Sequence, residues 1–371
     1  MIRTKKFYIF IFSLLIAACA INTVAPAANT STAPVSPSPS PTQQDLVTRL
    51  TDAIEASVQN HLFQGGSVLA GIDGKIILSQ GFGWADQEKK IANTALTRFR
   101  LGSVTKQFTA MAIMMLQERQ KLDTQERVCQ YLPDCPDSWK EITIHHLLTH
   151  TAGIPNFTAL SGYTTTWATP STPLETMARF RDRPLLFEPG DKFSYSNSGY
   201  IVLGYLIEIV SGLSYEAFLQ ENIFTPLHMA DSGYDHNQGD LPVGYNNFGA
   251  PAAYIDMSIP YAAGGLFSTV ADLYQWDQAL YTEKLLSQEL LSWMWTPHVN
   301  ETSTVQYGYG WEISFQNGHQ KIYHAGGVNG FTAYIVRYPA EKITVIILSN
   351  HENTNTFSLG DQLAGVLLEG R

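Results

Sequence analysis

The chain carries the stretch Gly102-Ser103-Val104-Thr105-Lys106, and the residues after it repeat apolar side chains at helical spacing. Residues three positions apart share a face of a helix, so Ser103 and Lys106 are expected to lie side by side at its first turn. A serine hydroxyl becomes a nucleophile when a nearby base takes its proton. A lysine can be that base where burial or a neighbouring cation leaves it neutral. On its own, such a stretch is more often a serine that caps a helix and a lysine that faces solvent.

A second stretch of interest is Tyr195-Ser196-Asn197, which follows a turn at residues 188–191. In an extended segment, residues two apart point the same way, so Tyr195 and Asn197 can enter one cleft. Beside a lysine ammonium the tyrosine anion is favoured, which predicts a base or proton relay. The blander alternative is a tyrosine that packs in the core and an asparagine in a turn.

A third stretch is His324-Ala325-Gly326-Gly327, which enters an apolar segment typical of a strand. Gly326 and Gly327 remove side chains where a substrate backbone could lie against that strand. A backbone N–H there could join the N–H of Ser103 as an oxyanion hole. The alternative is a glycine bulge in an edge strand, with His324 merely exposed.

In this order and at these separations, the three motifs resemble those of the serine β-lactamase and penicillin-binding-protein superfamily. The resemblance is greatest to its class C-like branch, which also holds D-peptidases and esterases. Supporting segments agree at residues 144–153 (IHHLLTHTAG), 264–269 (GGLFST) and 330–331 (GF). The resemblance covers about residues 50–350. It implies an α/β sandwich-like lobe beside an all-α lobe, with the site between them.

The resemblance also implies roles for individual residues. Ser103 is then the acylated nucleophile, and Lys106 and Tyr195 share the duties of general base and proton relay. Asn197 holds the substrate amide. The backbone N–H groups of Ser103 and Gly327 form the oxyanion hole.

The third motif departs from the pattern of the branch's β-lactamases. They usually carry Lys where this chain has His324, and Thr where it has Ala325. A neutral imidazole attracts a substrate carboxylate less than an ammonium does, and Ala325 offers no hydroxyl donor. Both changes favour a peptidase or an esterase over an efficient β-lactamase.

Outside these motifs, the sequence of residues 45–371 predicts strands at both ends and helices between them. A helix is predicted over residues 44–61, and an Asp73-Gly74 pair between two apolar runs predicts a hairpin over 67–80. A second hairpin is expected over residues 333–349, and a short helix over 360–368. We therefore expect an α+β fold whose antiparallel sheet is built from both ends of the body. Its sheet lobe should span about 45–100 and 300–371, and its helical lobe about 104–300.

The N-terminus reads as an export signal followed by a tether. Basic residues precede an apolar run that ends at Ile16-Ala17-Ala18-Cys19, which resembles a bacterial lipobox. Residues 1–18 are therefore predicted to be a signal peptide, with Cys19 lipidated, and the Pro-rich residues 19–44 a spacer. An ordinary signal peptide with an incidental cysteine, or an uncleaved anchor, are the alternatives.

The composition argues against a protein that binds nucleic acids. The 371 residues carry 23 Lys and Arg against 33 Asp and Glu, a net charge of −10 that gives nucleic-acid phosphates no attracting field.

In an exported chain, Cys129 and Cys135 could form a local disulfide, while a cytoplasmic chain would keep two thiols. His146 and His150 are spaced for two imidazoles on one metal, with His145 adjoining them. The segment lacks the glutamate of a zinc-peptidase helix, so we expect a structural turn and no metal.

Together these observations predict a serine hydrolase that acts on an amide or ester through an acyl-enzyme. The expected substrate is a small molecule or peptide, such as a D-amino-acid peptide, an ester or a β-lactam, and no cofactor is expected. The predicted location is the cell envelope, through a lipid anchor on a membrane. The alternative from another class is a non-catalytic penicillin-binding sensor or cell-wall scaffold module.

Overall fold

The computed structural model describes residues 42–239, 241–369 and 371. The predicted signal peptide, Cys19 and nearly all of the predicted spacer lie outside these residues. The first element is helix α1 (Gln43–Gln59), which begins after Thr42 in a reciprocal capping box with Asp45. The helix therefore starts within the last residues that were assigned to the spacer.

An antiparallel sheet forms the frame, in the order β2-β1-β13-β12-β11-β10-β9-β8. Its strands are β1 (Gly66–Ile72), β2 (Lys75–Phe82), β8 (Val299–Asn300), β9 (Gln306–Tyr307), β10 (Glu312–Gln316), β11 (His319–Val328), β12 (Phe331–Tyr338) and β13 (Ile343–Ser349). Strands from opposite ends of the sequence meet at β1 and β13, with Gly66 opposite Ser349 and Ile72 opposite Ile343. The predicted α+β class and the origin of the sheet are confirmed.

Both predicted hairpins are present. Strands β1 and β2 turn around Asp73 and Gly74, whose φ angles of 52° and 73° suit a tight hairpin. Strands β12 and β13 pair from Thr332 opposite Ser349 onward and turn over residues 339–342.

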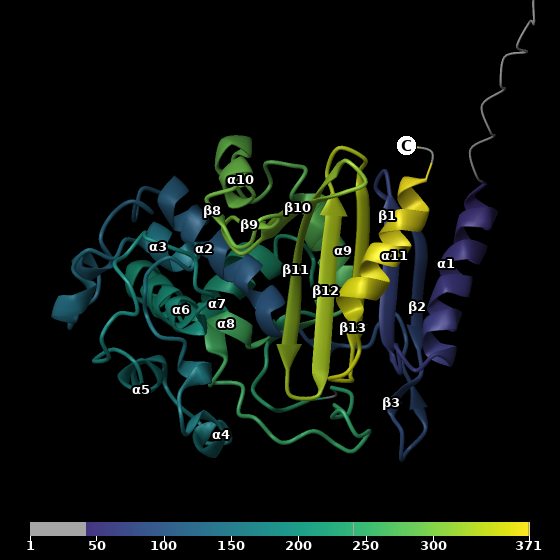
Figure 1. Cartoon of the computed structure of the whole chain (residues 1–371), viewed down its shortest axis with the longest axis horizontal. Helices are drawn as coiled ribbons and strands as arrows, with labels where there is room; N and C mark the ends of the chain where they lie inside the picture. Colours follow the sequence, from purple (N-terminus) through teal and green to yellow (C-terminus); the bar gives the residue numbers. More distant parts are fainter. Residues whose placement is uncertain (1–41, 240, 370) are drawn as a thin grey trace, which may run out of the picture. The chain divides into compact units, whose positions relative to one another are not determined.

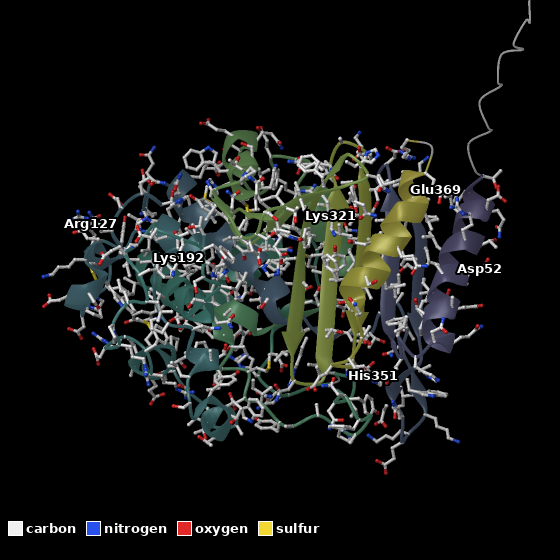
Figure 2. All side chains as sticks on the ribbon, viewed as in Figure 1. Asp52, Arg127, Lys192, Lys321, His351 and Glu369 are labelled. Atoms are coloured by element: carbon white, nitrogen blue, oxygen red, sulfur yellow. A yellow bond between two sulfur atoms is a disulfide. The ribbon has the colours of Figure 1, made fainter. Side chains whose placement is uncertain are left out.

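Helices cover both faces of the sheet (Figure 1). Helices α1 and α11 (Thr356–Leu368) lie over one face, and α9 (Val270–Ala279) contacts β1 and β13 on the other. All residues of β1 and β13 are buried, which explains why these strands read as continuous apolar runs. Figure 2 shows Asp52 on the side of α1 that is turned away from the sheet.

Helix α9 does not follow the predicted division of the body, which assigns about residues 104–300 to the helical lobe. This helix lies within the range assigned to the helical lobe, yet it packs on the sheet. A side chain at Gly71 would lie 2.7 Å from the ring of Tyr274, so the glycine lets α9 approach β1 closely. The sheet lobe therefore takes one covering helix from the middle of the sequence.

The remaining helices form the helical part of the fold together with α2 (Thr105–Glu118), which is buried from Thr105 to Leu116. They are α3 (Ile144–Leu148), α4 (Tyr163–Thr166), α5 (Pro173–Ala178), α6 (Asn197–Ser211), α7 (Tyr215–Leu219), α8 (Tyr261–Gly264) and α10 (Gln288–Met294). Helix α6 packs directly against α2 and is apolar on most of its surface, as a surrounded helix must be. It ends at Gly212, which adopts the left-handed conformation.

Short elements complete the described chain. The minor strands are β3 (Trp84–Asp86) with β4 (Ile91–Ala92), and β5 (Phe99–Arg100) with β7 (Leu266–Ser268) and β6 (Gly233–Tyr234). Single helical turns are η1 (Gly102–Val104), η2 (Val128–Gln130), η3 (Asp137–Trp139), η4 (Phe157–Ala159) and η5 (Gln220–Phe224). Strand β5 leads directly into η1 and then α2, so Ser103 lies between a strand and the central helix.

Cys129 and Cys135 form a disulfide bond. It closes a loop around η2 that packs on the helical part of the core. Of the two alternatives for this pair, the structure contains the disulfide.

Among the residues that the structure describes, no single helix has the length and apolar character to cross a membrane. One bent pair, Asn197–Ser211 with Tyr215–Phe224, passes that test by length and composition only.

Candidate active site

Ser103 lies in η1, where the chain passes against strand β11 with almost no space between the two backbones. A Cβ atom on Gly326 would lie 2.0 Å from the carbonyl oxygen of Leu101 and 3.0 Å from the nitrogen of Ser103. Gly102 adopts a positive φ of 51°, and a Cβ there would lie 2.6 Å from the nitrogen of Gly327. Only glycine fits at both contact points.

The two glycines of the third motif therefore do different things. The space beside Gly326 is filled by the Ser103 turn, so the expectation that substrate lies there does not fit the structure. A Cβ on Gly327 would meet no atom within 4 Å. Gly327 faces open space next to Ser103, as a residue of an oxyanion hole must.

Lys106 is fully buried, and its Nζ lies close to three oxygens. The distances are 3.1 Å to Ser103 Oγ, 2.8 Å to Asn197 Oδ1 and 2.8 Å to the carbonyl oxygen of Ala263. Burial lowers the pKa of Lys106 well below its usual 10.5. No carboxylate among the described residues forms an ion pair with this amine, so nothing there counters the effect of burial.

The three contacts are compatible with the neutral amine that burial favours. The Ala263 carbonyl and Asn197 Oδ1 can only accept hydrogen bonds, so they take the two N–H groups of a neutral lysine. The remaining lone pair then faces the Ser103 hydroxyl. That is the arrangement of a general base beside a serine nucleophile.

Asn197 is the first residue of α6, not part of an extended run with Tyr195. Ser196 before it has the extended geometry of a helix N-cap, and the Asn197 backbone N–H donates to Asn156 Oδ1. The Asn197 side chain lies between two groups. Its Oδ1 accepts from Lys106, and its Nδ2 donates to Thr158 Oγ1 over 3.2 Å.

Tyr195 lies behind the nucleophile, with Lys106 Nζ 4.9 Å from its ring centre. The ring also packs at 4.2 Å on His150. Burial raises the pKa of Tyr195, although its hydrogen bond with Ser103 opposes the rise. The expected tyrosine anion is therefore not supported: its stabilising partner would be a lysine ammonium, and Lys106 is held neutral. Tyr195 remains a phenol that can accept and return a proton.

His324 is only 2% exposed and ends a chain of buried hydrogen bonds. The Ser196 N–H donates to His150 Nδ1, so neutral His150 carries its proton on Nε2. That Nε2 lies 3.2 Å from the Tyr307 hydroxyl, which lies 3.0 Å from His324 Nε2. His324 Nδ1 donates to the carbonyl oxygen of Ala325 over 2.6 Å. In this series of hydrogen bonds, every donor meets one acceptor when both imidazoles are neutral.

This arrangement changes the role expected for His324. Burial lowers the pKa of His324 to about 3, so its imidazole stays neutral. The side chain faces Tyr307 rather than the cleft, and it cannot present a charge to a substrate carboxylate. Tyr307, which no sequence motif singled out, holds the ring in place.

The cleft beside Ser103 has a volume of about 190 Å³ and is lined without a single charged side chain. Its lining residues are Gly102, Ser103, Phe157, Thr158, Tyr163, Asn197, Ile255, Pro260, Ala263, Gly264, Gly327, Val328 and Asn329. Ser103, Asn197 and Gly327 line the cleft as the sequence predicted, while Lys106 is buried next to Ser103 and Tyr195 is not among the lining residues. Apolar side chains form much of the rest.

The chain matches the family model described as Beta-lactamase over residues 50–368. It belongs to this family. The resemblance inferred from the motifs is confirmed, and the chain is a serine hydrolase of the β-lactamase-related type.

Individual members of the family agree with this assignment. A putative penicillin-binding protein, PbpX of Bacillus subtilis, is 33% identical over 297 residues, which cover 78% of this chain and 71% of that protein. The octameric penicillin-binding protein homologue from Pyrococcus abyssi has a TM-score of 0.79 at 31% identity, over 87% of this chain and 77% of that one. A D-amino acid amidase from Ochrobactrum anthropi shares the fold, with a TM-score of 0.74 at 22% identity over 86% and 98% of the two chains.

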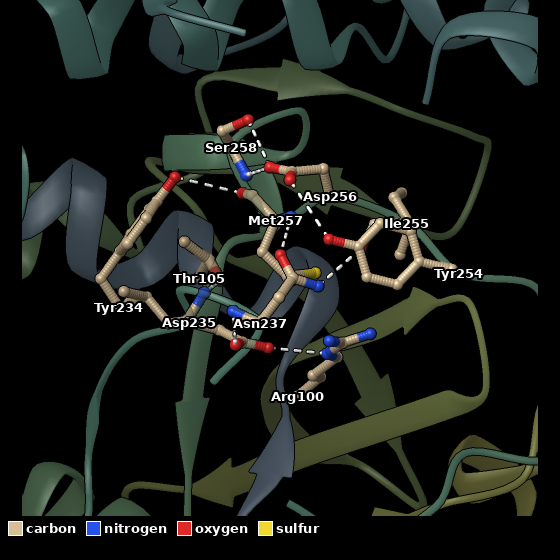
Figure 3. A network of polar contacts seen from close by, with 11 residues as sticks. Arg100, Thr105, Tyr234, Asp235, Asn237, Tyr254, Ile255, Asp256, Met257 and Ser258 are labelled. Carbon is tan, nitrogen blue, oxygen red and sulfur yellow. Dashed lines mark hydrogen bonds and ion pairs between the residues drawn. The ribbon is translucent and has the colours of Figure 1, made fainter. Parts of the chain in front are cut away.

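A polar network holds the loop that brings Ile255 to the cleft (Figure 3). Arg100 on β5 forms an ion pair of 2.7 Å with Asp235, and Asp235 Oδ1 accepts from the Asn237 N–H. Asn237 Nδ2 then donates to the Ile255 carbonyl, and its Oδ1 accepts from the Met257 N–H, both over 2.7 Å. The loop is thereby tied to the strand that leads into Ser103.

No sequence pattern identified the apolar residues of the cleft wall. Phe157, Tyr163, Ile255 and Val328 come from separate segments, and each looks like an ordinary core residue in its own segment. The one available signal was proximity to a motif, since Phe157 follows the family segment at 144–153 and Val328 follows Gly327.

Among the described residues, no three His, Cys, Asp or Glu side chains are grouped to hold a metal ion. The ring nitrogens of His150 are both taken by the hydrogen bonds described above. His146 Nδ1 accepts the Thr143 N–H as part of the cap of α3. These histidines therefore act in the structure of the family segment.

Proposed function

We propose that this family member hydrolyses amides or esters that lack a free carboxylate, by way of an acyl-enzyme on Ser103. The observation that carries the proposal is the cleft lining, which holds a nucleophile and both polar and apolar side chains but no charged one. The neutral amine of Lys106 supplies the base.

The first half of the reaction transfers the acyl group. Ser103 Oγ attacks the substrate carbonyl carbon while its proton passes to Lys106 Nζ, 3.1 Å away. The negative charge that develops on the carbonyl oxygen is stabilised by the backbone N–H groups of Ser103 and Gly327. The bond to the leaving amine or alcohol then breaks, and that group takes the proton from Lys106 through the Tyr195 hydroxyl.

The second half regenerates the enzyme. Water loses a proton to the same base and attacks the acyl carbon. The ester bond to Ser103 breaks, and Oγ recovers a proton as the carboxylic acid leaves. The Asn197 side chain, which already bonds Lys106 and Thr158, orients the base throughout.

The substrate preference follows from the charges near the cleft. A carboxylate meets no cation among the described residues that line the cleft, because His324 is buried and neutral and Lys106 is buried with a lowered pKa. Burying an unpaired carboxylate is costly. Phe157, Tyr163 and Ile255 instead suit an apolar acyl group. The structural relative from Ochrobactrum anthropi, a D-amino acid amidase, is in keeping with an amide substrate.

A matched pair of esters tests the proposal. p-Nitrophenyl butanoate and the mono-p-nitrophenyl ester of succinic acid have similar length, but only the second carries a carboxylate. We expect kcat/KM to favour the butanoate by about tenfold or more, and Ser103→Ala to lower it by roughly 10⁴-fold. An equal rate for the succinate would refute the substrate class. Stoichiometric labelling of Ser103 without turnover would instead identify a non-catalytic sensor.

We further propose that the protein is exported and lipid-anchored through Cys19. The support is the lipobox-like sequence before Cys19 and a disulfide at Cys129 and Cys135, which suits an oxidising compartment. Mass analysis of the protein isolated from membranes should find a diacylated N-terminal Cys19. A Cys19→Ser variant that stays in the membrane fraction would refute the lipid anchor.

A further inference from the structure

We propose that a second cavity, between α7, α8 and β6, binds a small organic cation such as a quaternary ammonium group. This site goes beyond the proposed hydrolysis and shares no lining residue with the cleft at Ser103. The cavity has a volume of about 190 Å³ and is lined by Ser171, Pro173, Glu208, Ser214, Tyr215, Glu216, Tyr234, Ser258 and Tyr261.

Three tyrosine rings gather at this cavity. The ring centres of Tyr215 and Tyr261 lie 5.0 Å apart, and those of Tyr234 and Tyr261 lie 6.2 Å apart at a steep angle. Two of the hydroxyls are tied to other groups. Tyr215 bonds Thr109 Oγ1 over 2.7 Å, and Tyr234 donates to the Met257 carbonyl over 3.1 Å, as Figure 3 shows for Tyr234. These two hydroxyl contacts hold the rings of Tyr215 and Tyr234 in place beside the cavity.

The charges at the cavity are negative. Glu208 and Glu216 are among the lining residues, and no lysine or arginine is. Burial, and after it the charge of Glu208, raises the pKa of Tyr261. The nearby His236 is engaged with Glu216, 2.8 Å away.

Aromatic rings combined with carboxylates favour a cation over an anion. A ring face attracts an ammonium group within about 6 Å, most strongly where water is excluded. An anion would meet two carboxylates and find no cation to pair with. The cavity is also smaller than the roughly 300–1,000 Å³ of pockets that take drug-sized ligands, so the ligand is small.

Helix α8 joins this cavity to the catalytic lysine. Tyr261 lines the cavity, and two residues later the Ala263 carbonyl accepts from Lys106. The Thr109 hydroxyl, which bonds Tyr215, also donates to the Ala262 carbonyl over 2.7 Å. A cation held against Tyr261 therefore contacts the same short helix that orients the base.

Calorimetric titration with choline chloride tests the site directly. We expect saturable binding to the wild type and to Ser103→Ala, whatever becomes of the proposed hydrolysis. Glu208→Gln should weaken binding by about tenfold, because it removes the charge and keeps an acceptor for the Tyr215 N–H. Tyr234→Leu should weaken it similarly, whereas Tyr234→Phe, which keeps the ring, should bind nearly as the wild type does.

The neutral isostere 3,3-dimethylbutan-1-ol separates recognition of charge from simple apolar burial. We expect it to bind at least about tenfold more weakly than choline. Equal affinity for the two compounds, unchanged binding by Glu208→Gln, or no saturable binding at all would each overturn the proposal. If Tyr234→Leu does not fold, the Glu208→Gln comparison still decides.

Discussion

The protonation state of Lys106 decides how the site works at the scale of single residues. Its burial favours the neutral amine, whose two N–H groups can bond Asn197 and Ala263 while its lone pair faces Ser103. The imidazoles of His150 and His324 are neutral as well, and no carboxylate among the described residues forms an ion pair with this lysine. The base is therefore ready before substrate arrives, and Tyr195 can serve as a neutral relay.

The activity should consequently depend on pH through Lys106. The acylation rate should rise with pH and reach a plateau, with its midpoint well below the usual lysine pKa of 10.5, because only the neutral amine accepts the proton. Lys106→Arg should lower kcat by roughly 10²–10⁴-fold, since a guanidinium stays charged. Pre-steady-state acylation measured across the pH range checks both.

The exposed Lys192, labelled in Figure 2, supplies the control. Lys192→Arg makes the same chemical change away from the cleft and should leave the pH profile as it is. A Lys106→Arg enzyme with wild-type kcat would show that the lysine is not the base.

At the scale of elements, the contact between η1 and β11 determines whether the site assembles. Two backbones meet there at distances that only glycine allows, and the nucleophile and Gly327 lie on opposite sides of the contact. The disulfide between Cys129 and Cys135 restrains the chain between α2 and α3.

The two adjacent glycines of β11 should respond differently to the same substitution. Gly326→Ala places a methyl group 2.0 Å from a backbone oxygen, so it should destabilise the fold by roughly 3 kcal/mol and abolish turnover. Gly327→Ala meets no atom within 4 Å and should fold normally. Its methyl group enters the cleft, so KM should rise. Urea denaturation and steady-state kinetics of both variants test the contrast, and equal stabilities would contradict it.

Removing the disulfide should cost stability but not activity. The loop it closes is short, so the double variant Cys129→Ser with Cys135→Ser should lose about 2 kcal/mol of unfolding free energy. Thermal denaturation should show a Tm lower by a few degrees, with kcat/KM unchanged because the loop lies outside the cleft lining. A variant with wild-type Tm would show that the bond does not restrain the unfolded chain.

At the scale of the whole described molecule, buried histidines make folding sensitive to acid. His351, at the end of β13, is fully buried and stacked 4.9 Å from Tyr245, and burial lowers its pKa to about 4. Its ring nitrogens have no hydrogen-bond partner among the described residues. The unfolded chain binds a proton at this histidine near pH 6.5, whereas the folded chain does not until about pH 4.

Stability should therefore fall as pH drops from about 6.5 to 4, and His351→Phe should reduce that fall. The phenyl ring keeps the stack on Tyr245 and cannot be protonated. We expect the difference in unfolding free energy between pH 7 and pH 4.5 to shrink by up to about 2 kcal/mol. Glu312, whose pKa is raised to about 7, acts in the opposite direction but is common to both proteins.

Urea denaturation at the two pH values measures this difference. The exposed His61 provides a matched control, because His61→Asn removes an imidazole from solvent rather than from the core. An unchanged pH dependence in His351→Phe would contradict the assignment of acid sensitivity to this residue.

The sequence by itself determined the family, the α+β class, both hairpins and the contact between Ser103 and Lys106, because each depends on local periodicity or on a short spaced motif. The tertiary structure alone decided the rest. Whether Lys106 is neutral depends on burial by α6 and α8, and whether His324 faces substrate depends on Tyr307 from β9, two strands away in the sheet. The uncharged cleft wall and the tyrosine-lined cavity are likewise assembled from segments far apart in the chain. Charge state and enclosure are properties of the surroundings in space, and no spacing along the sequence encodes them.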